Sequence, residues 1–214
     1  MNTTILLIRH GETAWNAERR LQGHADIALN DEGQRQADAL GLALAGEPLA
    51  AIVASDLLRA RQTALALAAH HDLPLLTDPQ LRERCYGGFE GLLYQDIAPR
   101  YPAEYARWKA RDVDALMPPG ARTAESLRQF YARSVAGIVS WAGRHPGQTI
   151  AIVAHGGVLE CARRAAQGGA LDTARDFEIK NASINRLLYA NGKLSISDWG
   201  DVRHLGEAAM DELL

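Results

Sequence analysis

The sequence contains little of what several protein classes require. It has two cysteines in 214 residues, Cys85 and Cys161, too few for a disulfide framework, so we expect reduced side chains and a cytoplasmic protein. The first apolar run covers about five residues before charge begins, which is too short for a signal peptide, and no later run approaches the roughly 20 apolar residues of a membrane span. A formal net charge of -3 gives no reason to expect a nucleic-acid or membrane partner.

Familiar catalytic signatures are also missing. The sequence has no His-Glu-x-x-His, no Cys-x-x-Cys, no P-loop ending in Gly-Lys-Ser/Thr, and no Gly-x-Ser-x-Gly turn. These patterns serve zinc hydrolases, thiol or zinc sites, P-loop NTPases and α/β-hydrolases respectively. We therefore predict no metal ligand set and no cofactor.

Short apolar runs alternate with amphipathic segments along the chain. The expected strands are residues 4–8, 50–54, 75–77, 149–154, 183–189 and 193–199, with Asn191-Gly192 as the hairpin turn between the last two. Helices are expected after caps at Asn30, Ser55-Asp56 and Ser126, and after residue 157. The pattern predicts one α/β domain over residues 1–214, with residues 81–120 as a lid-like addition.

One arrangement occurs twice, namely an apolar strand followed by His-Gly and then by a helix. The first strand leads into Arg9-His10-Gly11, and the strand at 149–154 leads into His155-Gly156-Gly157. Carboxyl ends of parallel strands share one edge of a sheet, where open α/β proteins bind ligands. Arg59 would lie on the first turn of the helix after the second strand, near the same edge. We therefore expect His10, His155 and Arg59 to meet.

This combination of side chains favours a phosphoryl group as the ligand. Arginine matches the oxygens of a dianionic tetrahedral group in bidentate fashion, and a helix start adds N–H donors. Phosphate held by fixed cations does not require a metal ion for neutralisation. An imidazole beside Arg9 and Arg59 should also have a lowered pKa, because both cations disfavour the imidazolium, and this would keep His10 neutral and able to attack.

An ordered set of motifs from residue 4 to about residue 205 resembles the histidine phosphatase superfamily. That family includes cofactor-dependent phosphoglycerate mutases, α-ribazole phosphatase and the bisphosphatase domain acting on fructose 2,6-bisphosphate. The matching motifs are Arg9-His10-Gly11-Glu12 (the RHG motif), Trp15-Asn16, Gln22-Gly23, Asp26, Ser55-x-x-x-Arg59-Ala-x-x-Thr63, Leu81-x-Glu83, Gly88-Phe89-Glu90-Gly91 and His155-Gly156-Gly157. The resemblance implies a phosphoglycerate mutase-like, three-layer α/β/α fold with a mostly parallel sheet and an antiparallel edge.

The resemblance also implies a role for each matching residue. His10 would be the nucleophile that becomes a phosphohistidine, and Glu83 would be the acid and later the base. Arg9, Arg59 and His155 would hold the phosphoryl oxygens. The remaining substrate-binding residues would be Asn16, Gln22, Gly23 and Gly156. The family's Gly-Glu-Ser before the long helix is Ala124-Glu125-Ser126 in this chain, which leaves any ligand contact from that loop open.

Simpler interpretations exist for several of these residues. Asn16 could cap a helix, and Glu12 or Glu90 could replace Glu83 as the acid. His24 is expected at the surface, as are His70, His71 and His145. Tyrosines and Trp108 between residues 86 and 108 fit a substrate pocket or a core, and the basic residues from Arg84 to Arg111 fit either an anionic substrate or a solvated face.

The resulting expectation is a metal-independent phosphomonoesterase for a small phosphorylated metabolite. Two alternatives remain open. A phosphoglycerate mutase shares the chemistry, but this chain is compact in its middle segment, and mutases of the family are usually longer there. A catalytically silent module would bind a phosphorylated partner without turnover. The sequence leaves a homodimer open and does not identify the phosphate ester.

Overall fold

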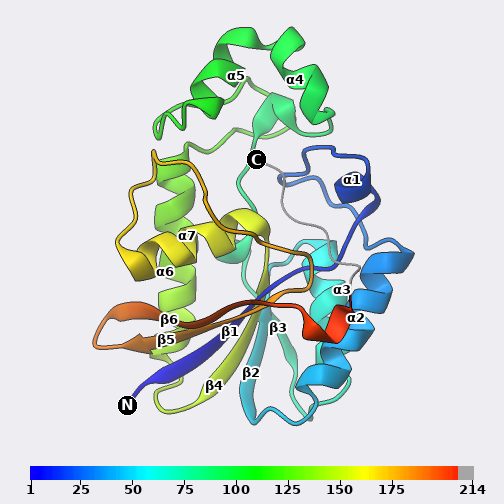
Figure 1. The fold of residues 1–214 in the computed structure, drawn as a ribbon, viewed down its shortest axis with the longest axis vertical. Coiled ribbons are helices and arrows are strands. Elements are labelled where there is room, and N and C mark those ends of the chain that lie inside the picture. Colours follow the sequence, from blue (N-terminus) through cyan, green and yellow to red (C-terminus); the bar gives the residue numbers. More distant parts are fainter. Residues whose placement is uncertain (207–214) are drawn as a thin grey trace.

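The computed structural model describes residues 1–206 as a twisted sheet between two layers of helices (Figure 1). Strands pair in the order β3-β2-β4-β1-β5-β6. Their bounds are β1 Thr3–Arg9, β2 Leu49–Ala54, β3 Leu75–Thr77, β4 Thr149–Ala154, β5 Ile184–Ala190 and β6 Lys193–Asp201. The first four strands are parallel, whereas β5 and β6 pair antiparallel, so the predicted α/β class with an antiparallel edge is confirmed.

Helices cover both faces of this sheet. They are α1 Ala14–Ala17, α2 Asp31–Leu44, α3 Leu58–Ala68, α4 Tyr94–Arg100, α5 Pro102–Lys109, α6 Leu127–Gly143 and α7 Gly156–Gln167, with short 3₁₀ helices at Pro79–Leu81, Gly87–Phe89 and Arg203–Leu205. Among residues 1–206, no helix is both long and apolar enough to cross a membrane.

The sequence located two helix caps correctly and one wrongly. Asn30 caps α2, and Ser126 forms a capping box with Gln129 at the start of α6. The cap predicted at Ser55-Asp56 is wrong, because α3 has Leu57 as its N-cap and no side chain caps it. The carboxylate of Asp56 instead accepts two hydrogen bonds from Arg82, at 2.7 and 2.6 Å.

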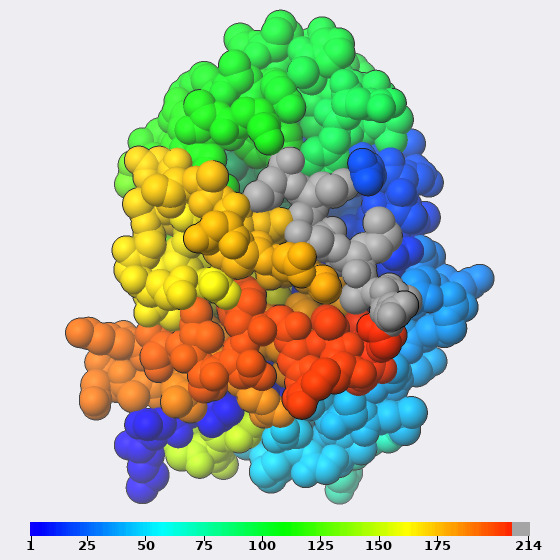
Figure 2. Space-filling view, in the orientation of Figure 1, coloured from blue at the N-terminus to red at the C-terminus, as the bar shows by residue number. Residues whose placement is uncertain are grey.

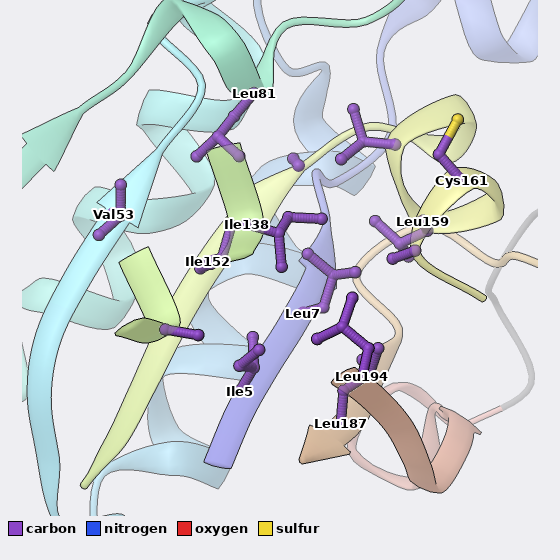
Figure 3. Close-up of a cluster of buried hydrophobic side chains, with 14 of the residues drawn as sticks. Ile5, Leu7, Val53, Leu81, Ile138, Ile152, Leu159, Cys161, Leu187 and Leu194 are labelled. Atoms are coloured by element: carbon purple, nitrogen blue, oxygen red, sulfur yellow. The ribbon is translucent and has the colours of Figure 1, made fainter. Parts of the chain in front are cut away.

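Strand β1 lies in the middle of the core and contributes to both faces. Ile5 and Leu7 pack towards α6 and α7 (Figure 3), while Leu6 and Ile8 pack towards α2 and α3. All four side chains are fully buried, as expected for a central strand in a parallel sheet, where successive side chains alternate between two covered faces. The site that follows β1 therefore stands on a rigid support.

Residues 81–120 form the green part of Figures 1 and 2, beyond the end of the sheet towards which β1 and β4 run. They contain α4 and α5, which their weak periodicity did not predict. Both helices are short, and they pack around a separate apolar cluster with Phe89 and Ile97 at its centre. This cluster depends on contacts between aromatic residues that a linear pattern does not reveal, including Phe89 with Trp108 at 5.7 Å between ring centroids.

The chain after His10 packs tightly against the first turn of α2. A Cβ on Gly33 would lie 1.9 Å from the carbonyl oxygen of Glu12, and a Cβ on Gly11 would lie 2.5 Å from the carbonyl oxygen of Gly33. Both positions accept only glycine, because the obstructing atoms are main chain. This contact holds the turn that carries Gly11 and Glu12 against the body of the protein.

We expect Gly33→Ala to destabilise the protein, because the added methyl group would force the turn after His10 away from α2. Overpacking of this kind costs about 1–3 kcal/mol. Gly46→Ala is the matched control, since a Cβ at Gly46 meets nothing within 4 Å. Urea unfolding of the three proteins measures the difference. Equal midpoints for Gly33→Ala and wild type would contradict the packing described.

Candidate active site

The two imidazoles project from adjacent strand ends. Strands β1 and β4 pair in parallel with Arg9 opposite Ala154, and the amide of His10 donates to the carbonyl of Ala154 at 3.0 Å. The next residues along the two strands are therefore His10 and His155. Their ring centroids are 5.1 Å apart, with an angle of 60° between the ring planes. The structure thus brings together the two histidines that the repeated motif singled out.

Hydrogen bonds define which nitrogen of the His10 ring carries the proton. The Nδ1 atom lies 2.6 Å from the carbonyl oxygen of Gly11, and a carbonyl only accepts, so Nδ1 carries the proton. Nε2 accepts a hydrogen bond from Nε of Arg59 at 3.3 Å. The lone pair of Nε2 therefore points towards a guanidinium, which is where an anionic electrophile would bind.

The pKa of His10 is lowered well below its ordinary value. Burial is the largest cause, followed by the charges of Arg59 and then Arg9, while the bond to Gly11 opposes the shift. The sequence predicted the direction and the role of the arginines, but not that burial would outweigh them. His10 has 3% of its surface exposed, and this degree of burial depends on segments distant in sequence.

His155 is fully buried, and neither ring nitrogen has a hydrogen-bond partner among residues 1–206. Burial again lowers its pKa, with Arg59 and His10 as the next causes. Buried polar atoms without partners are rare in folded proteins and usually indicate a functional constraint. A neutral imidazole here can exchange a hydrogen bond with a ligand that lies between the two rings.

Both predicted arginines are buried and anchored to main chain. Arg59, on the first turn of α3 as expected, donates from Nη1 to the carbonyl of Ala25 and from Nη2 to that of Gly23, each at 2.9 Å. Arg9 is the last residue of β1 and donates from Nη1 to the carbonyl of Ile179 at 2.7 Å. These bonds fix the direction of each guanidinium before any ligand arrives.

The carboxylate of Glu83 reaches the same region from the loop after β3. Its Oε1 accepts from the amide of Arg84 at 2.7 Å, and its Oε2 accepts from the amide of Gly157 at 2.9 Å. We had expected the free amides at the start of α7 to face an anionic ligand, but one of them holds this carboxylate. Glu83 lines the catalytic pocket together with His10 and Arg59.

The two alternative acids are engaged elsewhere. Oε1 of Glu12 accepts from the side chain of Asn30 at 2.8 Å. Oε1 of Glu90 accepts from the amides of His24 and Tyr86, at 3.0 and 2.9 Å. Neither Glu12 nor Glu90 lines the catalytic pocket, whereas Glu83 does.

The remaining predicted residues lie around the pocket. Asn16 is not the cap of α1, because Thr13 is its N-cap. Asn16 completes the capping box by accepting from the amide of Thr13 at 3.1 Å, and it also lines the pocket. Gln22 and Gly23 are in the lining as well. Gly156 is the first residue of α7 and follows His155 directly.

Further residues contribute to the pocket. Tyr86 and Tyr94 line it, as one of the two interpretations of the tyrosines allowed, whereas no pattern had indicated Arg19, Arg20 or Leu21 as lining residues. His24 was expected at the surface, which is wrong: it is half-buried, and its Nε2 lies 2.8 Å from the carbonyl oxygen of Glu83. Asn181, just before β5, donates to the carbonyl of His10 at 3.0 Å. No local pattern indicated Asn181, because its contact spans 171 positions of sequence.

A second cavity of about 140 Å³ adjoins the catalytic pocket and shares Tyr86 and Tyr94 with it. Its wall combines apolar side chains with cations, among them Trp108, Phe130 and Arg84. Gly157, whose amide holds Glu83, lines it as well. Arg84 is 4% exposed and donates from Nε and Nη2 to the carbonyls of Glu125 and Ala115, so it is not part of a solvated charged face.

Comparison with known proteins gives a consistent result. Residues 5–202 match the histidine phosphatase superfamily (branch 1). The chain is 40% identical over 207 residues to phosphoglycerate mutase-like protein 4 of Arabidopsis thaliana, covering 95% of this chain and 87% of the relative. It is 36% identical over 205 residues to the metal-independent phosphoserine phosphatase of the same plant, covering 95% and 83%.

A solved structure agrees with these relatives. Bacillus stearothermophilus YhfR superposes with a TM-score of 0.86 at 32% sequence identity, covering 95% of this chain and 99% of that protein. The paired histidines at adjacent strand ends thus stand in a fold shared along almost the whole chain. The chain belongs to the histidine phosphatase superfamily and is an enzyme of its first branch.

Proposed function

We propose that this enzyme is a metal-independent phosphomonoesterase that hydrolyses a small phosphorylated metabolite through a phosphohistidine on His10. The observation that carries the proposal is the state of the His10 ring. Its Nδ1 proton is committed to the carbonyl of Gly11, and its unprotonated Nε2 faces the guanidinium of Arg59. A neutral nucleophile next to a fixed cation suits attack on a phosphoryl dianion.

Binding of the phosphoryl group would rely on fixed positive charge. Arg9, Arg59 and His155 hold its oxygens, helped by the side chain of Asn16 and the amide of Gly156. Gln22 and Gly23 shape the pocket wall, and the carbonyl of Gly23 anchors Arg59. Because both guanidinium groups are anchored to main-chain carbonyls, they lose little freedom when the substrate arrives. Charge neutralisation of this kind needs no metal ion.

The reaction would proceed in two displacements. Nε2 of His10 forms a bond to phosphorus while the ester P–O bond breaks, and Glu83 transfers a proton to the departing oxygen. Water then attacks the phosphohistidine, Glu83 accepts its proton, and the N–P bond breaks to release inorganic phosphate. Glu83 is well placed for both steps, because its carboxylate is held between the catalytic pocket and the adjoining cavity.

The adjoining cavity would receive the alcohol part of the substrate. For scale, an engineered cavity of about 150 Å³ accommodates a benzene molecule. A cavity of about 140 Å³ therefore suits a small metabolite. Four cations and two carboxylates, Asp112 and Glu160, line it, and this excess of positive charge favours a metabolite that carries negative charge beyond the phosphate.

Phosphoglycerate mutase activity is the second candidate, supported by the similarity to phosphoglycerate mutase-like protein 4. A mutase must return the phosphoryl group from the same histidine to its bound product instead of to water. The geometry of His10, His155 and Arg59 serves both outcomes. Turnover of 3-phosphoglycerate primed with 2,3-bisphosphoglycerate distinguishes them, since a mutase yields 2-phosphoglycerate and a phosphatase yields inorganic phosphate.

We expect wild-type protein to hydrolyse p-nitrophenyl phosphate and members of a phosphometabolite panel with EDTA present. His10→Ala should lower kcat/KM by more than about 10³-fold, because loss of a nucleophile removes the covalent route. His70→Ala is the control, since His70 is exposed on α3's C-terminal side and touches no part of the site. Wild type without turnover on any phosphomonoester would instead support a silent binding module.

As the pH falls, the His10 ring should become protonated only at a pH below 6.5, which is the ordinary pKa of histidine. Because the pKa is lower in the folded protein, the unfolded chain binds the proton more readily. The free energy of unfolding should therefore decrease as the pH falls through 6.5. NMR titration of the His10 ring measures the pKa. In Arg59→Met the pKa should rise but remain lowered, because burial is the larger cause. A wild-type value at or above 6.5 would refute this description of the nucleophile.

A further inference from the structure

The guanidinium of Arg133, on α6, donates to main-chain carbonyls of four residues in the segment that carries Glu83, the weakest contact being that to Pro79 at 3.4 Å. Its Nη1 donates to the carbonyls of Gln80 at 2.7 Å and Arg82 at 3.1 Å, and its Nη2 donates to the carbonyl of Glu83 at 3.2 Å. One side chain thus fixes the main chain on the N-terminal side of the proposed acid. We call this set of contacts the Arg133 clamp.

Glu125 holds the Arg133 clamp in place from the other side. Its carboxylate accepts from Nε and Nη2 of Arg133, both at 2.7 Å, in a bidentate pair. Its Oε2 also accepts from the amide of Cys85 at 3.0 Å, and its own main chain accepts from Nε of Arg84. Glu125 therefore binds the segment after Glu83 while Arg133 binds the segment before it.

His24 adds a third contact at the same point. Its Nε2 donates to the carbonyl of Glu83 at 2.8 Å, and it lies 4.0 Å from Oε2 of Glu125. The carbonyl of Glu83 thus accepts from two side chains, one from the loop between α1 and α2 and one from α6. A carbonyl oxygen has two lone pairs, so these two donors fix the peptide group of Glu83 from two sides.

We propose that Arg133, held by Glu125, is a positioning residue that aims the Glu83 carboxyl at the leaving oxygen of the substrate. Arg133 itself lines neither the catalytic pocket nor the adjoining cavity. It acts through the main chain at Gln80, Arg82 and Glu83. The inference rests on the proposed function, in which Glu83 is the acid. This positioning role also gives a function to the loop Ala124-Glu125-Ser126, in which Glu125 accepts two hydrogen bonds from Arg133.

Lysine cannot replace arginine in this arrangement. A guanidinium presents five N–H donors in a rigid plane. Here they serve both carboxylate oxygens of Glu125 and the carbonyls of four residues. An ammonium keeps the charge but has three donors and no such plane. Arg133→Lys should therefore preserve the ion pair with Glu125 while loosening the bonds to the main chain at Glu83.

Dependence on the leaving group separates positioning from general damage. A p-nitrophenolate departs without protonation, whereas an alkoxide needs the proton of Glu83. We expect Arg133→Lys to lower kcat/KM for an alkyl phosphate such as phosphoserine about tenfold or more, and for p-nitrophenyl phosphate less than about threefold, because general acid catalysis contributes 10²–10⁴-fold. Glu125→Gln should show the same selectivity, and Glu83→Gln should show it in full.

Arg128→Lys is the matched control. Arg128 lies on the same helix and pairs with Asp114 at 2.8 Å, but that pair is exposed and does not contact the segment around Glu83. The control should leave both rate constants unchanged. Combining Arg133→Lys with Glu83→Gln should add no further loss for the alkyl ester, since the clamp has no proton left to position.

The outcomes distinguish failure of the positioning role of Arg133 from failure of the proposed phosphatase function. Equal losses on both esters in Arg133→Lys, no loss on either, or a full additional loss on the Glu83→Gln background would each overturn the positioning role, while the proposed function would stand. If Glu83→Gln itself affects the two esters equally, Glu83 is not the acid, and both proposals fail on that point.

Discussion

The parallel pairing of β1 with β4 sets the distance between the two imidazoles, and the rest of the site is arranged around it. Arg9 lies opposite Ala154, so the two strands end at the same level and deliver His10 and His155 side by side. The strands themselves are almost completely buried between two helical layers, which leaves their ends little freedom to separate. A central position in a doubly covered sheet is therefore what makes a two-histidine site rigid.

Burial determines the chemistry of the site as well as its shape. It lowers the pKa of both histidines, and the neighbouring arginines lower the pKa values further. The same burial makes each guanidinium depend on main-chain carbonyls, as Arg59 does on those of Gly23 and Ala25. The result is a region of fixed positive charge with neutral imidazoles, which is complementary to a phosphoryl group and costly to the folded protein without one. The close packing of Gly11 against Gly33 holds the turn after His10 in place beside this charged region.

The sequence predicted the parts of the fold and site that local patterns encode. Buried strands read as uninterrupted apolar runs, Asn30 and Ser126 mark helix starts, and His-Gly after a strand marks a sheet edge. It could not predict α4 and α5, since their stability depends on one aromatic cluster, nor the contact of His24 with Glu83, since 59 positions separate them. The Arg133 clamp could not be predicted either, because its residues are also far apart in the sequence. Nothing in the local sequence around an arginine on a long helix indicates that it will contact four carbonyls of a distant segment.

In the proposed reaction the phosphoryl group passes through Nε2 of His10. The most direct measurement is to mix the enzyme with a phosphomonoester, quench the reaction in alkali within the first turnover, and locate the phosphate by mass spectrometry and ³¹P NMR. We expect an acid-labile phosphoramidate on the peptide that contains His10, with the N–P bond at Nε2. Phosphate found at Nδ1 or on another residue, or turnover with no phosphorylated protein at any quench time, would contradict it.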